Sequence, residues 1–352
     1  WIEYMSINKL IKRKGDSMPN IGIIGAGRIG KVHVESIVTQ VADARVTGLA
    51  DPYMNEQTAA WAKQMAVGRV TKDYREILSD PDIDAVLICS STDTHAALSI
   101  EAIEAGKHVF CEKPVDHDIA RIKQVMAALE AHPVKYQVGF NRRFDHNFSA
   151  VQRAVAEGRI GDPHIIRITS RDPEPPGTDY IKVSGGMFLD MTIHDFDMAR
   201  FLAGCNATEI YVEAAVLVDP AIGEAGDVDT AVITMKMENG AIVTIDNSRK
   251  AVYGYDQRVE VFGSKGMVSV SNDTISSAVI SNADGVTGEK PLYFFLERYM
   301  QAYAGEIRSF VQAIEQDTDT ALGIKDGLEP VRMGIAAGKS WKEHRPVKLS
   351  EI

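Results

Sequence analysis

Between residues 21 and 140 the chain alternates short apolar runs with longer stretches in which apolar positions recur at helical spacing. The apolar runs are nearly continuous, which is typical of parallel strands that are covered on both faces. The pattern predicts strands at residues 21–25, 45–50, 85–89, 108–111 and 136–140, and helices at residues 30–39, 55–65, 95–105 and 118–131. We therefore predict a doubly wound α/β domain, which has right-handed crossovers and binds ligands beyond the carboxyl ends of its strands.

After residue 140 the pattern changes to strands that follow one another directly. A helix at 147–157, a strand at 164–171, a proline-rich loop at 172–177 and a helix at 188–202 come first. Strands are then expected at 209–218, 230–236, 241–248, 257–262 and 267–270, joined by turn signals such as Glu238-Asn239-Gly240. Consecutive strands with short turns predict an α+β domain with a large, mostly antiparallel open sheet. Two last helices, at 297–315 and 324–342, are expected to pack back on the first domain.

The patterns divide the chain into three parts. Residues 19–140 form the predicted nucleotide-binding domain, and residues 141–352 form a domain for substrate binding and oligomerisation. Residues 1–18 are interpreted as an extension outside the fold, either disordered or foreign to the native protein. They carry four basic side chains, but no apolar stretch or small-residue cleavage site follows, so we do not expect a secretory signal.

Composition narrows the classes of partner. The 352 residues include 49 acidic and 38 basic side chains, a formal net charge of −11, which argues against a nucleic-acid binder and favours a small-molecule or protein partner. No apolar run approaches the ~18 residues of a membrane helix. The 3 cysteines, Cys89, Cys111 and Cys205, form no disulfide framework and no paired metal motif. We therefore expect a reducing, cytoplasmic compartment.

The strongest motif lies between the first strand and the first helix. It reads Gly25-Ala26-Gly27-Arg28-Ile29-Gly30, a GxGxxG pattern that begins where the strand ends and opens the helix. The first glycine makes the tight turn, the second admits a diphosphate close to the backbone, and the third lets the helix pack near the strand. The helix N-terminus, with Arg28 and Ile29, then faces the diphosphate. These residues predict a dinucleotide-binding Rossmann domain.

An acidic residue ends the second strand. Asp51 follows the first glycine at the distance where a carboxylate bonds the adenosine ribose hydroxyls. A carboxylate there repels a 2′-phosphate, and no Arg or Lys follows in residues 52–54. We therefore predict NAD rather than NADP, although a role for Asp51 as a helix N-cap is the alternative.

Hydroxyl residues follow the strand at 85–89. The segment reads Ser90-Ser91-Thr92-Asp93-Thr94-His95. Ser90 and Thr92 suit a loop against the cofactor, whereas Thr94 is an equally good N-cap for the next helix. His95 is a candidate cofactor contact, and a packed or capping histidine is the alternative.

A lysine follows the next strand, in Glu112-Lys113-Pro114. In this fold that position lies near the nicotinamide, so Lys113 is expected to place a positive donor at the reacting oxygen. The proline restricts the lysine backbone, and a cis bond is possible here. Glu112 is either an ion-pair partner of Lys113 or a cofactor contact, and the sequence does not distinguish the two.

The second half supplies an acid and a base on a predicted helix. Asp190 and His194 are four residues apart, so on a helix they share one face, and Asp197 continues the stripe. Histidine titrates near neutral pH and can take a hydroxyl proton as hydride leaves the same carbon, while a carboxylate orients the imidazolium. A purely structural Asp–His pair is the alternative. A metal site is not expected, because no third ligand lies at suitable spacing.

Together, the motif at residues 25–30, Glu112-Lys113-Pro114 and the Asp190-x-x-x-His194 helix resemble the glucose–fructose oxidoreductase/inositol dehydrogenase (Gfo/Idh/MocA) family. The resemblance runs from about Pro19 to the end of the chain. Other segments are similar to bacterial myo-inositol 2-dehydrogenases: residues 138–145, 170–173, 184–186, 190–197 and 253–258.

The resemblance implies an NAD-dependent oxidation of a ring hydroxyl of a polyol, with Lys113, Asp190 and His194 catalytic. It also implies a homotetramer joined through the open faces of the C-terminal sheets. Arg142, Asp172 and Tyr253 match segments that border the polyol pocket in such enzymes. The expected reaction is oxidation of myo-inositol to 2-keto-myo-inositol (scyllo-inosose). The alternatives are scyllo-inositol, chiro-inositol, glucose or xylose as substrate, and a non-catalytic NAD-binding sensor or regulator.

Overall fold

A computed structural model describes residues 18–352, so the prediction of an extension falls almost wholly outside the described residues. The described chain divides into two compact units. Among the described residues, the first unit combines residues 18–112 with Gln124–Gly139 and Glu306–Gly323. The second unit combines Lys113–Lys123, Phe140–Gly305 and Ile324–Ile352.

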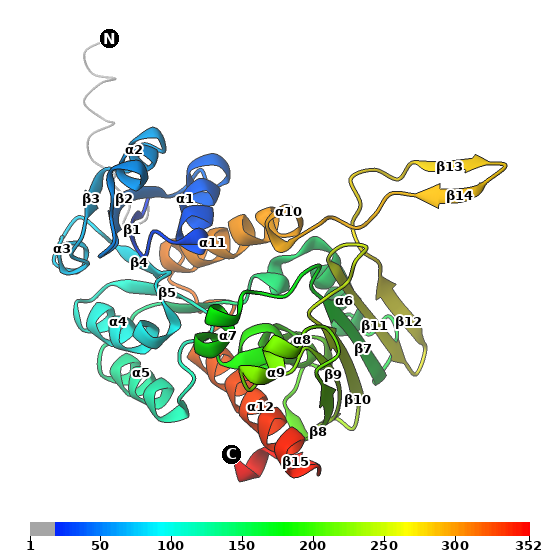
Figure 1. The fold of residues 1–352 in the computed structure, drawn as a ribbon. Coiled ribbons are helices and arrows are strands. Elements are labelled where there is room, and N and C mark those ends of the chain that lie inside the picture. The colour runs from blue at the N-terminus through cyan, green and yellow to red at the C-terminus, as the bar shows by residue number, and fades with distance from the viewer. Residues whose placement is uncertain (1–17) are drawn as a thin grey trace. The chain divides into compact units, whose positions relative to one another are not determined.

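The first unit is built on a six-stranded parallel sheet in the order β3-β2-β1-β4-β5-β6 (Figure 1). Its strands are β1 (Asn20–Ile24), β2 (Arg45–Ala50), β3 (Arg69–Thr71), β4 (Ala85–Ile88), β5 (His108–Glu112) and β6 (Tyr136–Gly139). The helices between them are α1 (Arg28–Gln40), α2 (Glu56–Gln64), α3 (Arg75–Leu78), α4 (Thr92–Glu104) and α5 (Ile119–Ala131). The inner strands β1, β4 and β5 are almost wholly buried, which explains their continuous apolar runs and confirms the doubly wound prediction.

The sequence did not predict β3 or α3. β3 is a three-residue edge strand without a buried residue, so it has no apolar run to detect. α3 is a single turn whose Ile77 fills the space above two glycines: a Cβ on Gly22 or Gly48 would lie 2.3 or 2.5 Å from the Ile77 side chain. Small residues in two neighbouring strands therefore accommodate one large residue of a short helix.

The second unit is built on a seven-stranded sheet in the order β12-β11-β7-β10-β9-β8-β15 (Figure 1). Only β10 and β7 run parallel, and the other pairs are antiparallel, which confirms the mostly antiparallel prediction. The strands are β7 (Pro163–Arg171), β8 (Ala207–Ala215), β9 (Thr230–Met237), β10 (Ile242–Ser248), β11 (Asp256–Gly263), β12 (Gly266–Val270) and β15 (Val347–Lys348). A two-stranded hairpin of β13 (Val279–Asn282) and β14 (Gly285–Gly288) was not predicted.

Helices cover one face of this sheet. α8 (Ile193–Ala203) packs on β7, and α12 (Ile324–Glu343) packs on β8 and on α8. Residues of β9 alternate strictly between buried and exposed, as expected for a sheet with one covered face. The remaining helices of the chain are α6 (His146–Ala156), α7 (Thr178–Ser184), α9 (Pro220–Glu224), α10 (Phe295–Arg298) and α11 (Met300–Glu315). No helix in residues 18–352 combines the length and hydropathy needed to cross a bilayer.

Two predicted helices are interrupted. The segment predicted as one helix at 188–202 begins as a π-helical turn, η3 (Met187–Met191), and continues as α8. Gly185 and Gly186, with φ of +87° and +74°, end α7 and force this new start, since other residues rarely adopt such angles. The segment predicted at 297–315 is α10 followed by α11, separated by the non-helical backbone of Tyr299.

Candidate active site

The glycine-rich turn joins β1 to α1. A Cβ on Gly25, whose φ is +106°, would lie 2.6 Å from the carbonyl of Cys89, and a Cβ on Gly30 would lie 2.0 Å from the Gly25 carbonyl oxygen. Packing therefore requires the first and third glycines. A Cβ on Gly27 would meet nothing within 4 Å. Gly27 is the N-cap residue of α1, and no side chain caps the helix there. The first N–H groups of α1, including those of Arg28 and Ile29, lack intrahelical acceptors, which is how helix starts bind diphosphate.

Asp51 follows β2, and both of its carboxylate oxygens accept backbone hydrogen bonds. Ala26 N–H donates to Oδ2 at 2.7 Å, and Tyr53 N–H donates to Oδ1 at 2.8 Å. The first bond ties the acid to the glycine-rich turn. The N-cap of α2 is Asn55, whose side chain accepts from Thr58 N–H at 2.9 Å, so the N-cap interpretation of Asp51 is wrong.

The hydroxyl segment after β4 forms its own small network. α4 begins at Thr92 with Ser91 at the N-cap, so Thr94 lies inside the first turn and is not the cap. Ser90 Oγ and Thr94 Oγ1 are 2.6 Å apart. His95 is 2% exposed, and its Nε2 lies 3.1 Å from the Ser90 carbonyl oxygen. His95 is therefore a packed histidine, which was the alternative to a cofactor contact in the sequence analysis.

Glu112 ends β5 and is buried. Its Oε1 lies 2.6 Å from Nε2 of His33 on α1, a partner that the sequence did not indicate. Lys113, the next residue, begins a cis peptide bond to Pro114 and belongs to the second unit.

Lys113 and Asp190 meet in the second unit. Lys113 Nζ donates to the Asp190 carbonyl oxygen at 3.0 Å and lies 3.7 Å from carboxylate Oδ1. The other two partners of that carboxylate come from elsewhere in the unit. Tyr180 OH donates to Oδ1 at 2.9 Å, and Arg249 Nη2 donates to Oδ2 at 3.3 Å. A lysine, an arginine and a phenol therefore surround the Asp190 carboxylate.

His194 lies at the start of α8, largely buried, with its ring edge-on to Phe140 at a centroid distance of 6.0 Å. Its Nδ1 is buried and has no hydrogen-bond partner among the described residues. Burial, aided by the charges of Lys113 and Arg142, lowers the pKa of His194 well below its ordinary value. The imidazole is therefore neutral at physiological pH and able to accept a proton.

The predicted pairing of Asp190 with His194 does not rest on one regular helix. Asp190 lies in the π-helical turn and His194 in α8, so the four-residue spacing spans a change of helix type. Within residues 18–352 no hydrogen bond joins the two side chains. Asp197 does not continue a stripe into a pocket. It is 1% exposed and ion-paired at 2.6 Å with Arg143, a contact internal to the fold.

Asp172 and Arg142 lie in the same charged region. Asp172 is 3.5 Å from Nη1 of Arg249, which therefore contacts both Asp172 and Asp190. Burial raises the pKa of Asp172 to about 6, and the charges of Arg249 and Arg142 oppose this rise. Arg142 is buried and ion-paired at 2.6 Å with Asp195. Its place at the border of the polyol pocket stays a prediction.

Tyr253 lies at the edge of the β7–β10–β11 region. Its OH donates to Asp256 Oδ2 at 2.6 Å and accepts from Arg171 Nη1 at 3.2 Å. The residue that sequence reasoning missed is Arg249, which is 3% exposed and follows β10. It belongs to no recognisable motif, and only its position after a strand that neighbours β7 could have indicated it.

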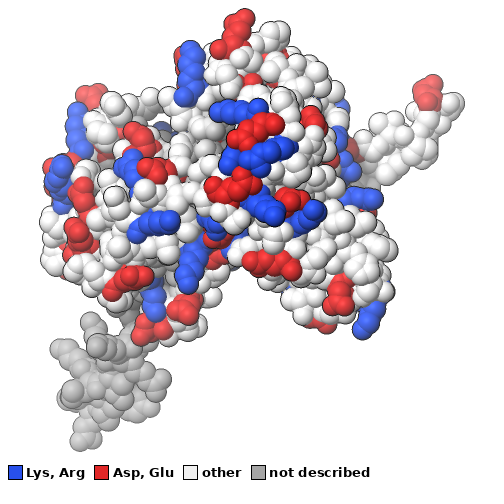
Figure 2. Space-filling view, turned by 90° about the horizontal axis from the view of Figure 1, so that it is seen from below, with Lys and Arg blue, Asp and Glu red and all other residues white. Residues whose placement is uncertain are grey.

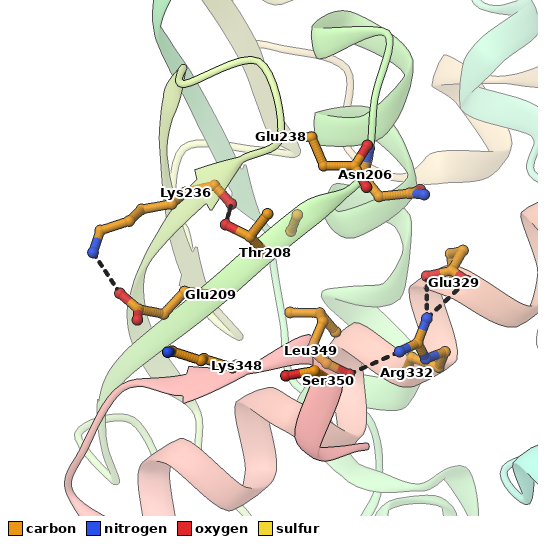
Figure 3. Close-up of a pocket in the computed structure, with 11 residues that line it drawn as sticks. Asn206, Thr208, Glu209, Lys236, Glu238, Glu329, Arg332, Lys348, Leu349 and Ser350 are labelled. Atoms are coloured by element: carbon orange, nitrogen blue, oxygen red, sulfur yellow. Dashed lines mark hydrogen bonds and ion pairs between the residues drawn. The ribbon is translucent and has the colours of Figure 1, made fainter.

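A cleft elsewhere in the second unit contains none of the predicted site residues (Figure 3). Its charged side chains pair among themselves: Lys236 with Glu209, and Arg332 with Glu329. Charge is also mixed on the surface, because on the face drawn in Figure 2 Lys and Arg lie among Asp and Glu rather than in one patch. Neither feature provides a second candidate for the cofactor.

The first unit's residues fit NAD. The open position at Gly27, the uncapped start of α1 and the carboxylate of Asp51 are the three features that a diphosphate and an adenosine ribose require. The profile of an oxidoreductase family with an NAD-binding Rossmann fold matches residues 19–140. Fold and site together therefore define an NAD-dependent oxidoreductase. The profile of the GFO/IDH/MocA C-terminal domain matches residues 148–269, and the chain belongs to this family.

Individual relatives agree with the family. The chain is 46% identical over 332 residues to a myo-inositol 2-dehydrogenase of Thermotoga maritima, covering 94% of this chain and 99% of that protein. It is 47% identical over 330 residues to an inositol 2-dehydrogenase of Rhizobium meliloti, covering 94% and 98%. A crystal structure of scyllo-inositol dehydrogenase from Lactobacillus casei, with bound NAD(H) and scyllo-inositol, superposes with a TM-score of 0.87 at 30% identity, covering 95% and 99%.

Proposed function

We propose that this chain oxidises myo-inositol to 2-keto-myo-inositol (scyllo-inosose). The observation that carries the proposal is a largely buried, uncharged imidazole, His194, within electrostatic range of the Lys113–Asp190 pair. Two relatives at 46% and 47% identity are named for myo-inositol or inositol, whereas two proteins named for scyllo-inositol match at 32% and 30%, which supports myo-inositol among the isomers. NAD, when bound, accepts the hydride from the ring carbon.

His194 is the general base in this proposal. Since Nδ1 is the buried nitrogen, Nε2 is the one available to a substrate hydroxyl. The reacting C–H bond gives up a hydride and the O–H bond gives up a proton, so that the carbon and oxygen become a ketone. His194 takes the proton and becomes an imidazolium, which then releases it to solvent.

Lys113 holds the oxygen that reacts. A fixed ammonium stabilises the negative charge that develops on this oxygen as its proton leaves. Asp190 positions the ammonium, because its carbonyl oxygen accepts from Nζ and its carboxylate lies 3.7 Å away. In place of a direct Asp–His pair, we therefore assign Asp190 to the lysine.

Asp172 binds a further ring hydroxyl, and the other charged groups hold the site in place. Asp172 is an acceptor for a hydroxyl when ionised, and Arg249 keeps it and Asp190 in place. Arg142 acts indirectly by fixing Asp195, and Tyr253 by fixing Asp256. In the first unit, Gly25, Gly27, Arg28, Ile29, Gly30 and Asp51 hold the diphosphate and ribose, and Ser90, Thr92, His95 and Glu112 support the loops beside them.

We also propose a homotetramer that works in the cytoplasm. The open face of the seven-stranded sheet exposes large apolar side chains, each about half accessible: Val232, Ile242, Phe262 and Met267. Association of two such faces removes them from water. The three cysteines are free, as suits a reducing compartment. Light scattering on the purified chain, with Val232→Lys as a disrupted variant, measures the assembly, and a monomeric wild type would contradict it.

The reaction is tested by following NADH formation with purified protein. The substrates are myo-inositol, scyllo-inositol, chiro-inositol, glucose and xylose, each with NAD and with NADP. We expect the highest kcat/KM with myo-inositol and NAD. A higher kcat/KM with another polyol would leave the proposed mechanism in place and reject myo-inositol as the substrate. NADH binding without turnover of any polyol would reject the enzyme and favour a sensor.

A further inference from the structure

A second cluster of titratable groups lies inside the first unit and shares no residue with the set assigned to the polyol. His33, in the second turn of α1, is 0% exposed, and its ring packs edge-on against Phe110 of β5 at a centroid distance of 5.2 Å. Its Nε2 lies 2.6 Å from Oε1 of Glu112 at the end of β5. The helix that begins with the diphosphate-binding turn is thus bonded to the end of a central strand.

Glu306 of α11 completes the cluster. It is 0% exposed, and neither of its carboxylate oxygens has a hydrogen-bond partner among the described residues. One side-chain atom from each of His33, Glu112 and Glu306 lies within 4.8 Å of the other two. Gly139 of β6 leaves the space for this arrangement, since a Cβ there would lie 3.2 Å from Oε1 of Glu112.

Two buried carboxylates cannot both be ionised without compensation. Moving a second negative charge into a water-free interior beside the first is far more costly than keeping a proton on one of them. A protonated His33 would compensate one of the two charges and leave the other, and a divalent cation bound by all three side chains is the remaining way to compensate both. The His33–Glu112 distance of 2.6 Å is that of a hydrogen bond, and two ligands of one metal ion lie farther apart.

We propose that Glu112 and Glu306 share one proton, and that this proton links α11 and β5, through His33, to the cofactor-binding helix α1. Glu306 and Glu112 are then positioning residues for the diphosphate site. Glu306 donates to Glu112, and His33 donates to the same carboxylate, so one negative charge remains on the cluster instead of two. The inference uses only the NAD-binding unit and does not depend on which polyol reacts.

The linkage has a definite sign. Burial and the neighbouring charge of Glu112 raise the pKa of Glu306 well above its ordinary value. A carboxyl whose pKa is raised by folding contributes stability that is complete below the pKa of the unfolded state and is lost as pH rises through the folded-state pKa. The groups near Glu306 are His33 of α1, Cys89 after β4 and Glu112 of β5. Wild-type protein should therefore lose stability as pH rises from the ordinary carboxyl pKa through the raised pKa of Glu306.

The variant Glu306→Gln tests the proposal, because its amide is neutral at every pH and can donate to Glu112. Glu104→Gln, an exposed residue of α4, is the matched control. Tm and the Kd for NADH are measured for the full chain from about pH 6 to about pH 9. We expect Tm to fall and Kd to rise about fivefold in the wild type and the control, and both to stay nearly constant in E306Q.

Parallel pH curves for the wild type and E306Q would overturn the proposal. So would one equivalent of a divalent metal that co-purifies with the wild type and is lost in His33→Ala. A merely structural role for Glu306 predicts lower stability at all pH values, not a change in slope. If E306Q fails to fold, the wild type decides the question. We expect a protonated-carboxyl infrared band that persists above the ordinary carboxyl pKa and is lost as pH rises further. Its absence would reject the shared proton.

Discussion

The two units contribute to function by different physical means. In the first unit the ligand site is made from backbone: a glycine turn, the open start of α1 and a single carboxylate. In the second unit the proposed polyol site is made from charged side chains brought together from distant segments, with Arg249 contacting both Asp172 and Asp190. Backbone sites bind a group common to many substrates, whereas side-chain sites distinguish one substrate from another. Substitutions in the two units should therefore affect different constants.

The largest effect is expected from His194→Asn. Loss of the general base should lower kcat about a thousandfold, while the Kd for NADH, which belongs to the other unit, stays within about twofold. Steady-state kinetics and NADH fluorescence titration measure the two constants. His132→Asn, an exposed histidine, is the control. Equal losses of rate and NADH affinity would reject the role of His194.

Lys113→Met should lower kcat about a hundredfold, because the charge that stabilises the developing oxyanion is gone. It should also move the pH profile. The Lys113 charge holds the pKa of His194 down, so its removal raises that pKa, and residual activity is lost at a higher pH on the acid side. Lys123→Met, exposed on α5, provides the comparison. If the acid side of the pH–activity profile does not shift, the Lys113 charge does not act on the pKa of His194.

Within the first unit, Gly27→Ala and Gly30→Ala separate binding from packing. A methyl group on Gly27 meets no protein atom, so Tm should stay unchanged while the Kd for NADH rises about tenfold. A methyl group on Gly30 would lie 2.0 Å from a carbonyl oxygen and should destabilise the unit by about 2 kcal/mol. Thermal unfolding and NADH titration test both. Unchanged NADH affinity in Gly27→Ala would mean that the diphosphate binds elsewhere.

The smallest effect is expected from Arg249→Met. Arg249 lowers the pKa of Asp172, which lies at about 6, so its loss raises that pKa further. Less Asp172 is then ionised near neutral pH, so KM for the polyol should rise about threefold. The rise of KM on the acid side of the pH profile should also begin at a higher pH. KM measured across pH tests this, with the exposed neighbour Lys250→Met as the control. A changed KM for NAD would contradict the expectation that substitutions in the second unit affect only the constants for the polyol.

The same division explains what could be predicted from sequence. The glycine turn and Asp51 are local features, because a helix start and a strand end are each encoded in a few adjacent residues. The neutral state of His194 and the role of Arg249 depend on neighbours far away in the chain, which no single segment reveals. The regular helix expected to carry both Asp190 and His194 was mispredicted for a related reason. Two positive-φ glycines before it start a π-helical turn, and the regular 3.6-residue period does not extend across such a turn.

The composition of the first unit has a consequence for synthesis of the protein. Strand β6, at the edge of the parallel sheet, is bonded to a segment made much later: Val138 N–H donates to the Leu322 carbonyl, and Thr320 Oγ1 donates to the Tyr136 carbonyl. The first unit is therefore incomplete until the ribosome has passed residue 323 and released that segment. Vectorial folding of the N-terminal 140 residues leaves a sheet edge exposed on the nascent chain, and chaperones that bind such edges have their opportunity in that interval.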